Sequence, residues 1–307
     1  MMQIFRHIAP SDAATALTIG NFDGVHLGHQ AILQGLTAQA QAQELLPAVM
    51  TFEPHPREFF SPHTAPTRLT SLREKLELFE EAGLQRVYLC RFNHMLAAVS
   101  AGDFIRRMLH PLKPGLILVG DDFRFGARRA GGLAELRAAG FAVGSLTDVL
   151  LDGERVSSTA VREALAAGDL VRAQQLLGRP YSISGHVIHG DKVGRQLGYP
   201  TANIHMLHAR PPLFGIYAVK LRGLGAHDLP GVASLGVRPT VKQDARPLLE
   251  VHLFDFDQQI YGRHVRVLFL HKIRDEAKFP DLETLKQQIG ADEQAARDYF
   301  KTRLSDD

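Results

Sequence analysis

Two histidines, His26 and His29, stand three residues apart at the beginning of a stretch of helical character. Residues three apart on a helix share a face, so both imidazole rings can point at one ligand. The first turn of a helix leaves N–H groups free and carries the positive end of the helix dipole, which favours anions. This combination suits a polyphosphate. The alternative is that both rings only cap or pack the beginning of the helix.

The pattern around the histidines predicts a strand, a turn and a helix in that order. Residues 17–19 are apolar and partly β-branched, as in a buried strand. Gly20 and Gly24 bracket the turn, where glycine tolerates the positive φ angles of tight turns. From residue 27 to about 43, leucine and alanine recur at helical spacing and form an apolar stripe.

A group of hydroxyl side chains begins another expected helix, which runs to residue 167. Ser157, Ser158 and Thr159 are natural helix caps, and capping alone accounts for them. Capping does not account for Arg162, a cation in the first turn, where the helix dipole disfavours positive charge. A bound phosphate would reverse that preference.

A loop rich in aspartate and phenylalanine, residues 120–126, follows an apolar strand expected at 115–120. Phe123 or Phe125 can stack on an aromatic ring, and Asp122 can bind hydroxyl or amine groups. The alternative is a turn that contributes two phenylalanines to the core.

Strands and helices alternate through the first half of the chain, which predicts an α/β domain with a doubly wound parallel sheet. Ligands of such sheets lie beyond the carboxyl ends of the strands. Three segments with polar side chains fall at strand ends, namely residues 21–29, 53–56 and 121–126. We therefore expect the fold to bring these three segments together.

After Tyr181, short strands with frequent glycine and proline replace this alternation. Such spacing predicts a small antiparallel β-barrel, with a helix over residues 282–303 packed on it. The strands are expected at 183–188, 215–221, 231–235, 248–254 and 265–270. We expect two domains, residues 1–180 and 181–307.

Glu250 is the candidate base of the second half. Alternation along its strand places Glu250 and His252 on one face and Leu249 and Val251 on the other. A carboxylate among apolar neighbours is costly unless it is paired or used, and burial would raise its pKa toward the range of a general base. The alternatives are an edge-strand glutamate that faces water, or a salt bridge to an arginine. The candidate arginines are Arg238, Arg266 and Arg274.

A glycine-rich segment, residues 185–203, is the other candidate site of the second half. Its glycines allow a loop to lie close to a ligand. The segment lacks the residue order of a Walker A phosphate loop. It ends in the sequence Pro200-Thr201-Ala202-Asn203.

Motifs in both halves, in matching order, resemble one family. His26-Leu27-Gly28-His29 is similar to the HxGH motif of nucleotidylyltransferases, and the string GNFDGVHLGH looks like the bacterial bifunctional riboflavin kinase/FAD synthetase family. The strings GDDFRFG, SSTAVR and PTAN are also similar to motifs of that family. Asp122 stands where family members carry asparagine.

For the first half, the resemblance implies a nucleotidylyltransferase domain that joins FMN to the AMP part of ATP and releases pyrophosphate. His26, His29 and Arg162 would stabilise the developing charge and the leaving pyrophosphate. The implied binding residues are Gly20, Asn21, Phe22, Asp23, Gly24, His55, Asp122, Phe123, Arg124, Ser157, Ser158 and Thr159.

For the second half, the resemblance implies a riboflavin kinase that uses ATP and Mg²⁺ to make FMN. Glu250 would accept the proton of the riboflavin 5′-hydroxyl. Thr201 and Asn203 would hold the metal and the nucleotide, since hydroxyl and amide oxygens suit a hard cation. The implied binding residues are Gly190, Lys192, Gly198, Pro200 and Arg274.

Composition limits the other classes of function. A formal charge of +2 over 307 residues gives no argument for nucleic acid or an anionic membrane as partner. Cys90 is the single cysteine, so an intrachain disulfide and a cysteine-based zinc site are excluded, and we expect a core thiol. No apolar run reaches the ~18 residues of a membrane span, and the N-terminal residues lack a signal-peptide pattern, so we expect a cytoplasmic protein. Two alternatives stay open: an adenylyltransferase whose second domain only binds, and a flavin-binding regulatory protein without turnover.

Overall fold

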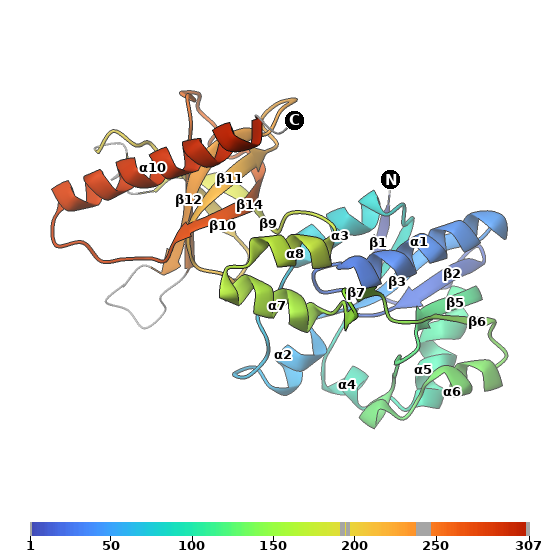
Figure 1. Cartoon of the computed structure of the whole chain (residues 1–307). Helices are drawn as coiled ribbons and strands as arrows, with labels where there is room; N and C mark the ends of the chain where they lie inside the picture. The colour runs from blue at the N-terminus through green and yellow to red at the C-terminus, as the bar shows by residue number, and fades with distance from the viewer. Residues whose placement is uncertain (1, 191–193, 195–196, 238–246, 305–307) are drawn as a thin grey trace. The chain divides into compact units, whose positions relative to one another are not determined.

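The computed structural model describes residues 2–190, 194, 197–237 and 247–304. The chain forms two compact units, Met1–Pro66 with Leu72–Ser158, and Thr67–Ser71 with Thr159–Asp307. The first unit contains an open sheet with helices, and the second contains a barrel with a long terminal helix (Figure 1). This division falls near the beginning of the helix α7 (Ser158–Ala167), so the predicted boundary after residue 180 stays a prediction.

Six parallel strands form the sheet of the first unit, which confirms the α/β prediction. Their spatial order is β1 (Gln3–Phe5), β4 (Arg86–Arg91), β3 (Leu46–Glu53), β2 (Thr15–Ile19), β5 (Pro114–Gly120) and β6 (Val143–Leu146). The strand β1 was not expected from the sequence. The strand order changes direction between β2 and β5, because β3 follows β2 on one side and β5 lies on the other. Ligands of doubly wound sheets bind at this switch point.

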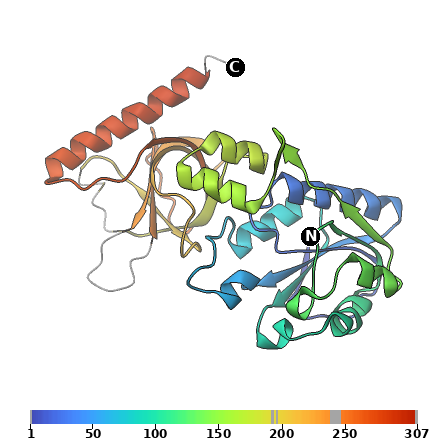
Figure 2. The ribbon, with the colours of Figure 1, turned by 60° about the horizontal axis from the view of Figure 1, so that its bottom comes forward.

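Helices cover both faces of this sheet (Figures 1 and 2). The helices of the first unit are α1 (Leu27–Ala42), α2 (Pro56–Phe60), α3 (Leu72–Glu81), α4 (His94–Ala97), α5 (Ala101–Phe104), η1 (Ile105–Leu109), η2 (His110–Leu112), η3 (Ala127–Arg129) and α6 (Leu133–Ala138). Leu33 of α1 and Phe79 of α3 pack on one face of the sheet, with Val49. Leu109 and Leu136 pack on the other face, so the sheet has two apolar layers.

Two parts of the first unit differ from the sequence prediction. The residues after β3 include a helix that the sequence analysis did not expect: Pro56 begins α2, where a missing N–H costs nothing. A short hairpin of β7 (Leu150–Leu151) and β8 (Glu154–Arg155) precedes α7 (Ser158–Ala167) and was also not expected. The predicted core position of Cys90 is confirmed, and burial raises the pKa of its thiol to about 12.

Six antiparallel strands close into the barrel of the second unit, as the second half of the sequence predicted. Their order around the barrel is β10 (Ala202–Met206), β13 (Pro247–Leu253), β12 (Leu229–Val237), β11 (Gly215–Arg222), β14 (His264–Arg274) and β9 (Ser182–Ile188). The strand β10 was missed, because the PTAN sequence was interpreted as part of a loop. It pairs with β9 and β13 and completes the closure.

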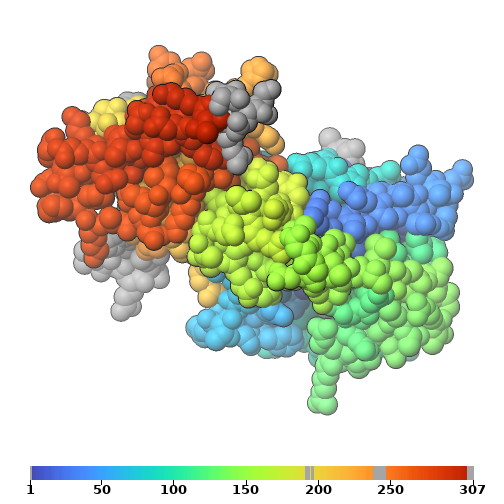
Figure 3. All heavy atoms as spheres, in the orientation of Figure 1, coloured from blue at the N-terminus to red at the C-terminus, as the bar shows by residue number. Residues whose placement is uncertain are grey.

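Helices also accompany the barrel. The helix α8 (Leu170–Leu177) is capped by Asp169 and ends at Gly178, whose φ of 69° is the left-handed conformation that glycine allows. The helix α10 (Leu282–Leu304) contacts β11, β12 and β14, and Ala296 is buried against Ile216 and Val232. Its atoms, red in Figure 3, form an uninterrupted ridge on the surface of this unit. The barrel unit therefore has one outer face covered by α10.

Candidate active sites

The two histidines lie at the switch point of the sheet. His26 occupies the N-cap position of α1, directly after the turn that follows β2. The rings of His26 and His29 stack with their centroids 3.7 Å apart and an angle of 20° between their planes. Within the described chain, the His26 side chain accepts no capping hydrogen bond from the first turn. Capping by His26 therefore has no support, whereas packing at the beginning of the helix stays open, because His26 is buried and the two rings contact each other.

The turn before α1 is strained at unexpected positions. Gly24 has a φ of 83°, as the sequence predicted, whereas Gly20 does not have a positive φ. The strain lies instead at Phe22 and Val25, with φ angles of 51° and 41°. A positive φ is a rare conformation for a β-branched residue such as valine, and such strain clusters at functional sites. Both side chains are buried in the core, and this packing holds the strained turn in place.

Asn21 presents a buried acceptor to this site. Its side-chain Oδ1 is inaccessible to solvent and has no hydrogen-bond partner among the residues that the structure describes. Its backbone carbonyl accepts a hydrogen bond from Thr51 at 3.4 Å. Asp23 is buried, and its carbonyl accepts a hydrogen bond from the Ser158 hydroxyl at 2.9 Å. The first residues of the SSTAVR segment are therefore joined to the turn that precedes the histidines.

The remaining residues of that segment belong to the second unit. There, Nε of Arg162 donates a hydrogen bond to the carbonyl of Thr67 at 2.6 Å. Thr159 is exposed and lies in the same unit. The expected role of both residues beside the histidines stays a prediction.

The structure assigns different positions to the two phenylalanines of the loop after β5, whose roles the sequence analysis did not decide. Phe125 is buried against Phe104, with ring centroids 5.3 Å apart, and belongs to the core. Phe123 is half-buried and stacks on Phe125 at 5.7 Å. Asp122 forms an ion pair with Arg155 at 2.8 Å. Phe123 is therefore the ring that can receive a ligand, whereas Asp122 already has a cationic partner.

A cavity of about 510 Å³ opens beside this loop at the carboxyl ends of the strands. It is lined by six phenylalanines, which are Phe52, Phe60, Phe92, Phe104, Phe123 and Phe125. Gly20, Asn21, Pro56 and Asp122 also line it, so the three segments after β2, β3 and β5 meet here as predicted. His55 caps α2, and its Nδ1 accepts a hydrogen bond from the backbone N–H of Arg57 at 3.1 Å.

Sequence reasoning missed much of the wall of this cavity. Phe60 is the last residue of α2 and Phe92 directly follows β4, and their rings lie 5.6 Å apart. Four arginines line the cavity: Arg124, which the resemblance had implied as a binding residue, and Arg57, Arg128 and Arg129, which it had not. Arg128 and Arg129 are consecutive residues with φ angles of 56° and 58°. The signals were the adjacent pairs Phe59-Phe60 and Arg128-Arg129.

In the second unit, Glu250 lies on a strand of the closed barrel that is paired on both sides. Its strand β13 pairs with β10 and β12, so the edge-strand alternative is wrong. Leu249 and Val251 are buried, while Glu250 and His252 are partly buried on the other face, which confirms the predicted alternation. Arg274, one of the three candidate ion-pair partners, binds Asp292 instead through Nε and Nη2, at 2.8 and 2.6 Å.

The predicted metal-binding residues lie directly beside Glu250. Asn203 is the strand partner of Glu250, and residues directly opposite in adjacent strands share a face. Thr201 lies directly before β10 and lines the same cavity as Glu250. A Cβ on Gly190 would overlap the Asn203 amide, so the glycine leaves the space that this amide occupies. Thr201 and Asn203 thus offer a hydroxyl and an amide oxygen close to Glu250, which fits a hard cation.

A second cavity, of about 360 Å³, lies on this outer face. It is lined by Thr201, Tyr199, Ser234, Glu250, His252, Arg274, Glu276, Phe279 and Asp292, together with apolar residues of β11, β12 and α10. Burial raises the pKa of Glu276. Lys192 and Arg238 lie outside the described residues. Among the described residues, no group of three or more His, Cys, Asp or Glu side chains could hold a metal.

Asp292 anchors α10 to the barrel, which gives a test of stability. We expect Asp292→Asn to destabilise the packing of α10 by about 2 kcal/mol, because it weakens the pair with Arg274, which is only partly exposed. Hydrogen exchange of peptides from α10 and β14 measures this change. The control is Asp298→Asn, an exposed residue of the same helix. Unchanged protection in Asp292→Asn would contradict the anchor.

Comparisons with known proteins match both halves of the chain. Residues 8–160 match a family model described as FAD synthetase, and residues 177–300 match one described as riboflavin kinase. The bifunctional riboflavin kinase/FMN adenylyltransferase of Escherichia coli K12 is 48% identical over 297 residues, covering 95% of this chain and 94% of the relative. The protein of that name from Haemophilus influenzae is 48% identical over 292 residues, covering 94% of each chain.

The chain belongs to the bifunctional riboflavin kinase/FMN adenylyltransferase family.

A solved structure supports the architecture of this family member. That structure, described as a macrolide-efflux protein from Streptococcus pneumoniae, superposes with a TM-score of 0.82 at 28% identity. The match covers 96% of this chain and 98% of that one. Across the part of this chain that the structure describes, no helix has the length and apolar character needed to span a membrane.

Proposed function

We propose that this chain makes FMN from riboflavin and ATP in its second half, and FAD from FMN and ATP in its first half. The order of the two family models and the curated relatives support this function. The observation that carries it is the set of side chains on the outer face of the barrel. Glu250, Asn203 and Thr201 are neighbours there, beside a cavity.

In the kinase half, Glu250 acts as the general base. It accepts the proton of the riboflavin 5′-hydroxyl as that oxygen attacks the γ-phosphorus of ATP. Thr201 and Asn203 hold Mg²⁺ together with the nucleotide phosphates. When bound, Mg²⁺ supplies positive charge that offsets the charge on the phosphate oxygens. The cavity between the barrel face and α10 receives the flavin.

In the adenylyltransferase half, the phosphate of FMN attacks the α-phosphorus of ATP and pyrophosphate leaves. His26, His29 and Arg162 stabilise the charge that develops in this step. The first turn of α1 lies at the histidines, and the beginning of a helix favours anions. No covalent enzyme intermediate is needed, because positioning and charge neutralisation are sufficient. We also propose a domain boundary at residue 180. Since both half-reactions consume ATP, we propose that the enzyme is cytoplasmic.

The aromatic cavity of the first unit holds the flavin ring of FMN, with Phe123 as a stacking partner. We expect Phe123→Ala to raise the KM for FMN by about 10-fold, since stacking on an aromatic side chain contributes about 1–3 kcal/mol. Steady-state FAD formation from FMN measures this. Riboflavin phosphorylation, which uses the other half, serves as the control. An unchanged KM for FMN would remove Phe123 from the flavin site.

The proposed function is tested by a chromatographic assay with ATP and Mg²⁺, run separately on riboflavin and on FMN. Conversion of riboflavin to FMN and FAD, and of FMN alone to FAD, is the expected result. FAD from FMN without turnover of riboflavin would leave only the adenylyltransferase. No product from either substrate would favour a flavin-binding protein without turnover.

A further inference from the structure

We propose that His252 is a positioning residue of the kinase half, which holds the PTAN segment against the strand of the general base. The inference rests on the proposed function, since it takes Thr201 and Glu250 as parts of the kinase site. His252 is absent from the residues that the family resemblance implied. It lies two residues after Glu250, on the same face of β13.

One ring nitrogen of His252 binds the segment that precedes Thr201. Its Nδ1 lies 2.9 Å from the backbone carbonyl oxygen of Pro200. A carbonyl only accepts, so Nδ1 carries the proton and donates it to this hydrogen bond. The Tyr199 ring packs edge-on against the imidazole at 5.7 Å. The backbone just before Thr201 is therefore tied to β13 by a side chain as well as by the strand pairing of β10.

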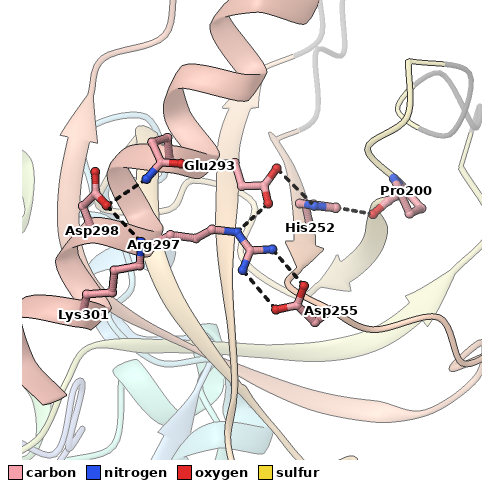
Figure 4. A network of polar contacts seen from close by, with 8 residues as sticks. Pro200, His252, Asp255, Glu293, Arg297, Asp298 and Lys301 are labelled. Carbon is pink, nitrogen blue, oxygen red and sulfur yellow. Dashed lines mark hydrogen bonds and ion pairs between the residues drawn. The ribbon is translucent and has the colours of Figure 1, made fainter.

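The other ring nitrogen faces the terminal helix. Nε2 of His252 lies 4.0 Å from Oε2 of Glu293 in α10, and Oε1 of Glu293 accepts a hydrogen bond from Nε of Arg297 at 2.7 Å. Arg297 in turn binds both carboxylate oxygens of Asp255, at 3.0 and 3.2 Å (Figure 4). Glu293 therefore lies between two basic side chains, one from the barrel and one from its own helix.

The two ends of this chain of contacts differ in burial: His252 and Glu293 are mostly buried, whereas Asp255 is exposed. The side chains of His252 and Glu293 are 13% and 20% exposed, whereas that of Asp255 is 81% exposed. Arg297 lies over the Phe254 ring at 4.3 Å, so the residue that follows the strand is also held. The hydrogen bond from Nδ1 to the Pro200 carbonyl orients the imidazole, and the Glu293 carboxylate lies near the other nitrogen.

This arrangement has a consequence for phosphoryl transfer. The base and the metal–nucleotide site come from different strands, and a displacement of about 1 Å between reacting groups can cost about 100-fold in rate. The Pro200 carbonyl is one residue from Thr201 and His252 is two residues from Glu250. The hydrogen bond between His252 and the Pro200 carbonyl therefore sets the distance between the base, Glu250, and the metal–nucleotide site at Thr201.

We expect His252→Ala to raise the KM for ATP in riboflavin phosphorylation by about 10-fold and to lower kcat/KM by about 10- to 100-fold. A variant that only loses part of its folded population would lower kcat without changing KM. FAD formation from FMN is expected to stay near its original rate. The matched control is His205→Ala, an exposed histidine on the neighbouring strand β10.

Two conservative variants decide between positioning and simple packing. The amide nitrogen of asparagine can take the place of Nδ1. We therefore expect His252→Asn to keep the hydrogen bond to Pro200 and to have a KM for ATP close to the original value. The amide of glutamine replaces Nε2, so His252→Gln is expected to resemble the alanine variant. This comparison also decides the matter if the alanine variant does not fold.

The outcomes separate the inference from the proposed function. If Glu250→Gln and Thr201→Ala abolish kinase activity while His252→Ala keeps the original KM for ATP, the inference is wrong and the function stands. Equal KM values for the asparagine and glutamine variants would also overturn the inference. If Glu250→Gln keeps full kinase activity, the proposed site itself is wrong.

Discussion

Replacing Glu250 by glutamine will lower the rate of riboflavin phosphorylation by about 10³-fold, within the range that general bases contribute. Glutamine has nearly the same shape, so the pairing of β13 with β10 and β12 is kept while the proton acceptor is lost. FAD formation from added FMN will stay nearly unchanged, because its residues lie in the other half. Both rates are measured by chromatography of flavins, on one preparation of the variant.

The control for this variant is Glu283→Gln, an exposed glutamate in the first turn of α10. We expect it to leave both rates unchanged. Equal loss of the two activities in Glu250→Gln would contradict the assignment of separate sites. A kinase rate within a few-fold of the original would show that Glu250 does not act as the base.

Replacing His29 by alanine will have the opposite effect. We expect FAD formation from FMN to fall by about 10²- to 10³-fold, the cost of losing one group that stabilises charge in the transition state. The His29 ring stacks on His26 and also contacts Phe22 at 5.0 Å, so its position is well determined. Riboflavin phosphorylation will continue, and the product will accumulate as FMN instead of FAD.

His7→Ala is the matched control, since His7 is an exposed histidine of the same unit. FAD formation at the original rate in His29→Ala would remove that histidine from the mechanism. The double variant with His26→Ala is expected to lose little more than either single variant. Groups that act on the same transition state are not additive.

Local spacing along the sequence was enough to predict several parts of the two sites. His26 and His29 share a face because three residues make nearly one helical turn, whatever lies around the helix. Glu250 and Leu249 lie on opposite faces because side chains alternate along any strand. The meeting of the loops after β2 and β5 followed from the rule that parallel strands end at the same edge of a sheet.

Other features depended on residues that are distant in the sequence. The alternation predicted which face Glu250 occupies, but the pairing of β13 with β10 and β12 showed that this face is not at an edge. Arg274 was a candidate partner of Glu250 or of the flavin, yet it forms its ion pair with Asp292 of α10. The charge of Arg274 does not by itself select its partner, because the sequence offers several carboxylates. The packing of α10 on the barrel brings Asp292 close to it.

The sequence by itself therefore determined the fold class, the two halves and the motifs, since these depend on local periodicity and on the order of residue types. Only the tertiary structure decided that Phe125 is a buried core residue while Phe123 stays half-buried at the cavity, because Phe104 of α5 packs against Phe125. It also decided that His252 contacts Pro200. Two segments about fifty residues apart meet there because the barrel closes.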